Sequence, residues 1–80
     1  MNLEIVTPDN KVFEGEITSV SLPGIDGSFQ ILNNHAPIVS ALGTGKLTVV
    51  DTENHTQEYT ISGGVVEMNN NKVIVLAESI

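Results

Sequence analysis

Turn-forming residues interrupt this chain at a spacing of about ten residues, which leaves runs that suit strands better than helices. The clearest interruptions are Pro8-Asp9-Asn10, Pro23-Gly24, Asp26-Gly27 and Asn69-Asn70-Asn71. Proline presets φ, while glycine and asparagine accept positive φ at low cost, so these clusters predict tight turns. No segment keeps a helical period over ten or more residues. The spacing therefore predicts an all-β chain.

The runs between the turns are short, rich in β-branched residues and often alternate between apolar and polar side chains. They lie at Asn2 to Thr7, Lys11 to Glu14, Glu16 to Leu22, Ser28 to Leu32, Lys46 to Asp51, Thr56 to Ile61, Val65 to Met68 and Lys72 to Ala77, and a small apolar stretch lies at Ile38 to Leu42. We expect seven or eight strands from these runs. Many short strands at regular spacing are typical of an antiparallel sandwich or barrel.

Alternation predicts which side chains face the core. Thr18, Val20 and Leu22 should share one face of their strand, with Ile17 on the other. The run from Val73 to Leu76 is apolar on both faces. Such a strand is either central in a sheet or has its outer face covered by something else.

Composition narrows the classes of protein. The chain has 80 residues, with 40% hydrophobic and 16% charged, so we expect one globular domain. It has no cysteine, which excludes disulfides and thiolate chemistry. Three lysines against ten acids give a net charge of −7, which disfavours nucleic acid and anionic lipid as partners. No apolar run is long enough to cross a membrane, and no signal peptide is expected.

Catalytic, metal and cofactor motifs are absent from the pattern. The histidines His35 and His55 lie in predicted loops, and no nucleophile and orienting carboxylate are placed beside them. Glu14 and Glu16 would share a strand face, where solvated charges that protect a sheet edge are the simpler explanation than a metal site. The segment from Gly24 to Gly27 lacks the lysine and the helix of a phosphate loop. We expect no active site, no metal, no cofactor and no small-molecule substrate.

Five segments in order resemble the epsilon subunit of the F-type ATP synthase, called delta in mitochondria. The most specific one contains Pro23-Gly24, Gly27, Ile31-Leu32 and His35-Ala36-Pro37. The others are Leu3 to Pro8, Val12 to Glu16, Ser62 to Glu67 and Asn71 to Ala77. The resemblance covers Met1 to about Glu78, with departures at Gln30, where the family usually has glycine, and Asn33, where it usually has proline.

The resemblance implies a fold and a role. The fold would be a small antiparallel β-sandwich or flattened barrel of roughly eight to ten short strands, spanning residues 1–80 as one domain. The role would be that of a non-catalytic rotor subunit in the central stalk, at the cytoplasmic face of a bacterial inner membrane, without direct lipid insertion. It would link the gamma subunit to the membrane c-ring and so couple proton flow to ATP synthesis. Most members continue into a C-terminal helical hairpin. This chain stops at Ile80, either naturally or by shortening, so regulation through the hairpin is not carried over.

The resemblance also implies two sets of contact residues. Contacts with the gamma subunit would come from Thr7, His35 and Ser40, with Ile38, Val39 and Leu42 as apolar support. Contacts with the loops of the c-ring would come from Asp26, Gly27, Ser28, Phe29 and Gln30.

Two other classes remain open on the residues alone. One is a small β-sandwich module that binds a peptide or a sugar, for which an aromatic-lined groove would be the sign. The other is a small β-barrel enzyme with a carboxylate metal site, for which stabilisation by metal would be the sign.

Overall fold

The computed structural model describes residues 1–80, which form eight strands and no helix. The strands are β1 (Asn2–Val6), β2 (Lys11–Gly24), β3 (Gly27–Leu32), β4 (Ile38–Leu42), β5 (Gly45–Asp51), β6 (Thr56–Ile61), β7 (Gly64–Asn69) and β8 (Lys72–Ala77). The all-β expectation is confirmed. The two runs predicted on either side of Gly15 are one strand, β2, because Gly15 keeps its place in the ladder opposite Leu3.

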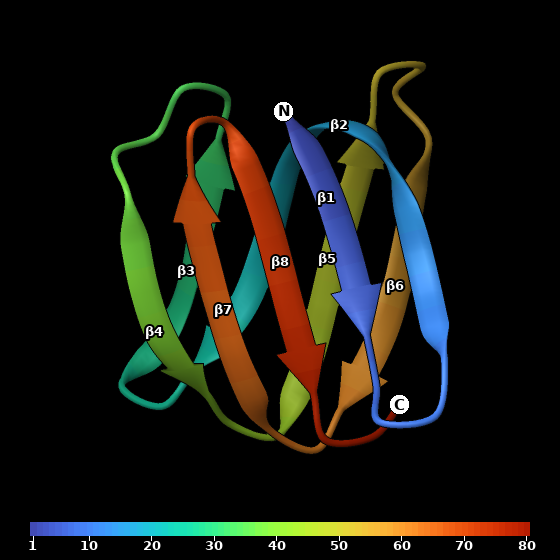
Figure 1. The fold of residues 1–80 in the computed structure, drawn as a ribbon, viewed down its shortest axis with the longest axis vertical. Coiled ribbons are helices and arrows are strands. Elements are labelled where there is room, and N and C mark those ends of the chain that lie inside the picture. The colour runs from blue at the N-terminus through green and yellow to red at the C-terminus, as the bar shows by residue number, and fades with distance from the viewer.

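The strands form two facing layers (Figure 1). In the front layer, β4, β7, β8 and β1 lie side by side, and the first part of β2 pairs with β1. In the back layer, the second part of β2 pairs with β3 on one side and with β5 on the other, and β5 pairs with β6. All pairs are antiparallel except β1 with β8, which are parallel. The long strand β2 therefore joins the two layers of the sandwich.

An irregularity in β2 decides which of its side chains face the core. In the pairing with β5, Ile17 lies opposite Asp51 and Ser19 lies opposite Val50, so one residue of β2 is left over between them. This bulge shifts the alternation by one residue. Ile17 and Val20 are both buried as a result, and Thr18 is exposed. The expectation that Thr18 shares a face with Val20 while Ile17 lies opposite is therefore wrong.

The core between the layers is entirely apolar. Its 16 residues are Met1, Leu3, Ile5, Ile17, Val20, Leu22, Ile31, Leu42, Leu47, Val49, Ile61, Val66, Met68, Val73, Val75 and Ala77. No polar or charged residue is buried. Every strand contributes at least one core residue, so the eight strands are held by one hydrophobic core.

Two hairpin turns differ in how well the sequence defines them. Asn70 and Asn71 join β7 to β8 with φ values of 51° and 60°, as the asparagine run predicts for a two-residue turn. Between β2 and β3 the two turn residues are Ile25 and Asp26 rather than Asp26 and Gly27. Gly27 begins β3 with a φ of 129°, a conformation that suits glycine almost alone.

Candidate docking surfaces

An apolar row crosses the outer face of the front layer from strand to strand. Val6 lies opposite Leu76, Leu76 lies opposite Val65, and Val65 lies opposite Ala41. Leu76 is 55% exposed and Val65 is 42% exposed. Val39, two residues before Ala41 on β4, points the same way and is 73% exposed. We call these five residues the apolar face.

The next row on this face is partly acidic. Glu67 lies opposite Val39 and Ile74, and Ile74 lies opposite Glu4. Lys11 reaches Glu4 at 2.9 Å. The hydrogen bond from Lys11 lowers the pKa of Glu4 below its usual value. The apolar face is therefore bordered by carboxylates.

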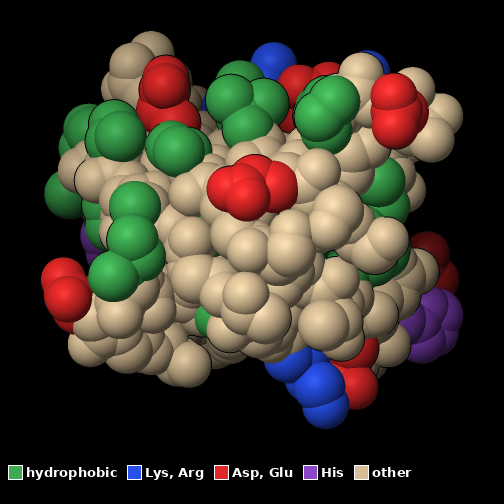
Figure 2. Space-filling view, turned by 90° about the horizontal axis from the view of Figure 1, so that it is seen from below, with side chains coloured by type: hydrophobic (Ala, Val, Ile, Leu, Met, Phe, Trp, Pro, Cys, Tyr) green, Lys and Arg blue, Asp and Glu red, His purple; other side chains and the backbone are tan.

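Figure 2 shows the end of the molecule that faces downwards in Figure 1, with hydrophobic, charged and other side chains distinguished by colour. Hydrophobic side chains gather towards the upper and left margins of this view, and the middle is mostly backbone and side chains that are neither hydrophobic nor charged, with one acidic side chain among them. Thr7, Val6 and Leu76 help to line a shallow hollow of about 370 Å³ that opens near this end. Only part of this end therefore offers apolar contact area.

The residues predicted to contact the gamma subunit fall into three places. Thr7 adjoins the apolar face at the end of β1, and Val39 lies within that face. His35 is exposed in the loop between β3 and β4, near the opposite end of the front layer (Figure 1). The apolar face lies between Thr7 and the His35 loop, so the structure separates these residues along one side of the sandwich.

The other three residues of that set point towards the inside of the sandwich. Leu42 is a core residue, only 4% exposed, and can support a contact surface only from beneath. Ile38 is partly buried and packs against the core. Ser40 points to the same side as Ile38 and lines a hollow at the edge of the sandwich. These three residues therefore add little to the outer face of the front layer.

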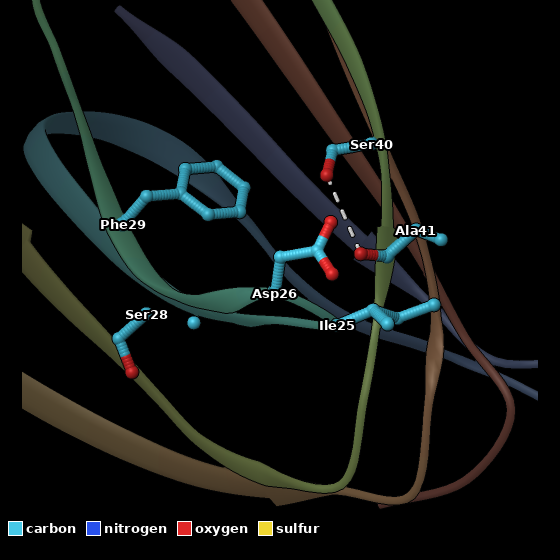
Figure 3. A pocket seen from close by; sticks show the side chains of 8 residues that line it. Ile25, Asp26, Ser28, Phe29, Ser40 and Ala41 are labelled. Carbon is cyan, nitrogen blue, oxygen red and sulfur yellow. Dashed lines mark hydrogen bonds between the residues drawn. The ribbon is translucent and has the colours of Figure 1, made fainter.

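Four of the five residues predicted to contact the c-ring line that hollow, namely Asp26, Gly27, Ser28 and Phe29. It has a volume of about 410 Å³ and is lined by Gly24, Ile25, Asp26, Gly27, Ser28, Phe29, Ser40 and Ala41. In Figure 3 the Asp26 carboxylate and the Phe29 ring point towards the same space, which Ser40 borders from β4. Gln30 lies outside it and lines a neighbouring hollow with Ser28 and Phe29.

Backbone hydrogen bonds hold the turn beside this hollow. The N–H of Ile25 donates to the carbonyl of Ala41 at 3.3 Å, and the N–H of Gly43 donates to the carbonyl of Pro23 at 2.7 Å. The β2–β3 turn is thereby fixed against β4 and the turn that follows it. Asp26, whose side chain is exposed, is presented at the tip of a supported turn.

The ionisable groups elsewhere stabilise loops. Asp51 Oδ1 accepts hydrogen bonds from the backbone N–H groups of Glu53 and His55, each at 2.9 Å. The His55 N–H is the main cause that lowers the pKa of Asp51. No cluster of three or more histidine or acidic side chains could hold a metal ion. The structure contains no helix that is long and apolar enough to span a membrane.

Sequence comparison gives the family. The profile described as ATP synthase, Delta/Epsilon chain, beta-sandwich domain matches residues 1–80. The chain is 44% identical over 78 residues to the ATP synthase epsilon chain of Chlorobium limicola, covering 98% of this chain and 89% of that one. It is 51% identical over 76 residues to the epsilon chain of Maridesulfovibrio salexigens, covering 95% of this chain and 53% of that one.

Solved structures show the same fold. A chain of the Euglena gracilis mitochondrial ATP synthase, solved as OSCP/F1/c-ring, superposes with a TM-score of 0.89 at 23% identity and covers 98% of this chain and 51% of that chain. A chain of the Tetrahymena thermophila mitochondrial ATP synthase central stalk and c-ring gives a TM-score of 0.79 at 18% identity, with 98% and 63% covered.

The fold is a small β-sandwich of the type found in ATP synthases. The chain belongs to the family of ATP synthase delta/epsilon chain β-sandwich domains. The fold expected from the resemblance is confirmed.

The predicted contact residues do not include Val6, Val65 and Leu76, which form most of the apolar face. The doubly apolar run from Val73 to Leu76 predicts either a central strand or a covered outer face, but it does not name Leu76 as a contact residue. Val6 and Val65 join Leu76 only through the register of β1, β7 and β8. A single chain sequence does not give that register.

Proposed function

We propose that this chain is a non-catalytic central-stalk subunit of a proton-translocating ATP synthase, of the epsilon type. Its family membership and its apolar face carry the proposal together. Residues 1–80 would form the sandwich domain that joins the rotor shaft to the membrane ring. Rotation of the ring would then turn the shaft, and proton flow would be coupled to ATP synthesis without an active site in this chain.

The apolar face is the proposed docking surface for the gamma subunit. Isolated exposed apolar residues are ordinary on protein surfaces, but a continuous strip across four strands is typical of an interaction site. The strip has the composition of an interface centre, which is depleted of charge, and Glu4 and Glu67 lie beside it as a polar rim would. Thr7 and the His35 loop would extend the contact at its two ends.

The β2–β3 turn is the proposed contact with the c-ring. Asp26 and Ser28 are exposed at a turn that backbone hydrogen bonds support, so they can be presented without a large loss of conformational entropy. The net charge of −7 would assist docking onto basic loops of the ring by electrostatic steering. In this arrangement the protein is peripheral and acts at the cytoplasmic face of a bacterial inner membrane through protein contacts alone.

The proposal is tested by mixing the chain with the gamma subunit from the same source and separating the mixture by size exclusion. We expect a complex of one chain of each kind. A second sample carries Val39→Lys, which places a charge at the β4 end of the apolar face and opposite Glu67, where it can form a cross-strand pair. This variant should remain folded and lose most of the complex. A folded wild-type chain that elutes separately from gamma would contradict the proposal.

A further inference from the structure

Asn71 connects three segments that are distant in sequence. Its side-chain Oδ1 accepts a hydrogen bond of 2.8 Å from the backbone N–H of Asn34, 37 residues away in the β3–β4 loop. Its backbone carbonyl accepts a hydrogen bond of 3.1 Å from the N–H of Asn2, at the start of β1. One turn residue therefore ties the β7–β8 hairpin both to the first strand and to the loop that carries His35.

The position of Asn71 requires a residue that tolerates a positive φ and also carries a side-chain hydrogen-bond acceptor. Asn71 has a φ of 60°, a conformation that glycine and asparagine adopt readily and most other residues do not. Glycine would satisfy the backbone but would offer no acceptor to Asn34. The atom facing Asn34 is the carbonyl oxygen rather than the amide nitrogen, because a backbone N–H needs an acceptor. The neighbouring Asn70 has a similar φ of 51°, and its side chain forms no hydrogen bond to the rest of the chain.

The β3–β4 loop has few other anchors. Asn34 has a φ of 63°, and the N–H of His35 donates to the carbonyl of Leu32 at 3.1 Å, which closes a local turn. His35 Nδ1 lies 2.7 Å from the carbonyl of the adjacent Ala36. These contacts are all within the loop or with the end of β3. The bond to Asn71 is the hydrogen bond that fixes the loop to the front layer.

We propose that Asn71 is a positioning residue that holds the His35 loop in the conformation in which it meets its partner. The inference rests on the proposed function, in which that partner is the gamma subunit. Because an ordered loop has less entropy to lose on binding, a preorganised His35 should bind more tightly than a mobile one. Asn71 would raise affinity through the loop without contacting the partner itself.

Three variants separate positioning from general stability. Asn71→Gly keeps the left-handed backbone and removes the acceptor. Asn71→Asp keeps an oxygen at the same place and should restore the hydrogen bond. Asn70→Gly is the matched control, since it makes the same change at the adjacent turn position, where no such bond exists. Glycine adopts both φ values without strain, and aspartate tolerates the left-handed region, so all three variants should fold.

The first measurement is amide hydrogen exchange at Asn34 in the isolated chain, which needs no partner. Loss of a side-chain hydrogen bond should speed exchange there about two- to tenfold in Asn71→Gly. Asn71→Asp and Asn70→Gly should stay close to wild type. The second measurement is the dissociation constant with the gamma subunit, which should rise by about the same factor in Asn71→Gly only. The thermal midpoint is recorded for each variant.

The outcomes are distinct. Unchanged exchange at Asn34 in Asn71→Gly would show that Asn71 does not hold the loop. Faster exchange with unchanged affinity for gamma would overturn the positioning role, as would an equal loss of affinity in Asn70→Gly. If wild-type chain does not bind gamma at all, the proposed function fails and the docking role of Asn71 fails with it. Exchange at Asn34 still decides whether the contact orders the loop.

Discussion

Val65 and Leu76 lie directly opposite each other on β7 and β8, and both point away from the core. Their inward neighbours Val66 and Val75, also opposite each other, are fully buried. The same two strands therefore present apolar side chains on both faces. One face forms the core of the sandwich, and the other is available to a partner.

The first prediction follows from this pair. Leu76→Thr introduces a β-branched residue that suits a strand but removes apolar area from the middle of the apolar face. We expect the dissociation constant with the gamma subunit to rise about tenfold, the effect of ~1–2 kcal/mol of lost burial, with little change in thermal midpoint.

The control for this prediction is Leu32→Thr. Leu32 is 52% exposed, close to the 55% of Leu76, but it lies on β3 in the back layer. The same substitution there should leave binding to gamma nearly unchanged. Equal losses of affinity in the two variants would contradict the assignment of the front layer as the docking surface.

The second prediction concerns Gly64, where β7 begins. A Cβ atom there would overlap the carbonyl oxygen of Leu76 on the paired strand, and the φ of 145° is itself unfavourable for other residues. We expect Gly64→Ala to lower the free energy of unfolding by more than ~3 kcal/mol, enough to unfold much of so small a domain. Urea denaturation followed by circular dichroism measures the loss.

Two further glycines separate the cost of the unfavourable φ from the cost of the close contact. Gly27 has a φ of 129°, but the space that an added methyl group would occupy is open, so Gly27→Ala should show the backbone cost alone, about 1–3 kcal/mol. Gly43 has neither an unfavourable φ nor a close neighbour, and Gly43→Ala should be nearly neutral. If Gly64→Ala cost no more than Gly27→Ala, the close approach of β7 to β8 would not be a source of strain.

The strands could be predicted from the sequence because their signals are local. Turn residues and alternating side chains fix where most strands begin and end, and the asparagine run fixes the β7–β8 turn. The faces of β2 could not be predicted in the same way. The bulge between Ile17 and Ser19 arises from pairing with β5, about 30 residues further along the chain, and strict alternation misses it.

The two candidate surfaces also differ in how far the sequence predicts them. The cluster from Asp26 to Phe29 is contiguous, so its residues necessarily come together once the turn forms. Val6, Ala41, Val65 and Leu76 come from four strands and meet only through the sheet order β1-β8-β7-β4. Leu42 was predicted to support the contact surface, but it points inwards while Val39 on the same strand points outwards. The apolar residues of β4 do not by themselves show which of the two directions each side chain takes.

The third prediction is a dependence of stability on pH through Asp51. Its pKa is lowered from 3.8 in the folded state, so its hydrogen bonds to the β5–β6 loop stabilise the fold fully above that value. The contribution is lost as the pH falls through the folded pKa. Asp51→Ala should therefore be clearly less stable than wild type at pH 6 and approach wild type near pH 2, measured as urea midpoints.

Asp9→Ala is the control for Asp51. Asp9 is an exposed acid in the β1–β2 turn whose side chain forms no hydrogen bond, so its removal should change stability little at either pH. Glu4 acts in the same direction as Asp51, since its pKa is also lowered, and should leave some acid sensitivity in Asp51→Ala. A difference between Asp51→Ala and wild type that is equal at both pH values would contradict the electrostatic explanation.

The fourth prediction tests the contact with the c-ring. Asp26→Arg reverses a charge at the tip of the β2–β3 turn, while Glu53→Arg makes the same change in the β5–β6 loop near the opposite end of the molecule (Figure 1). Both side chains are exposed, so both variants should fold and bind gamma. In membrane vesicles reconstituted with an ATP synthase that carries each variant, we expect Asp26→Arg to reduce proton-driven ATP synthesis several-fold and Glu53→Arg to leave it close to wild type. Because like charges across an interface cost several kcal/mol, repulsion between the introduced guanidinium and basic ring loops accounts for the loss. Equal synthesis in the two variants would show that the ring contacts this domain elsewhere.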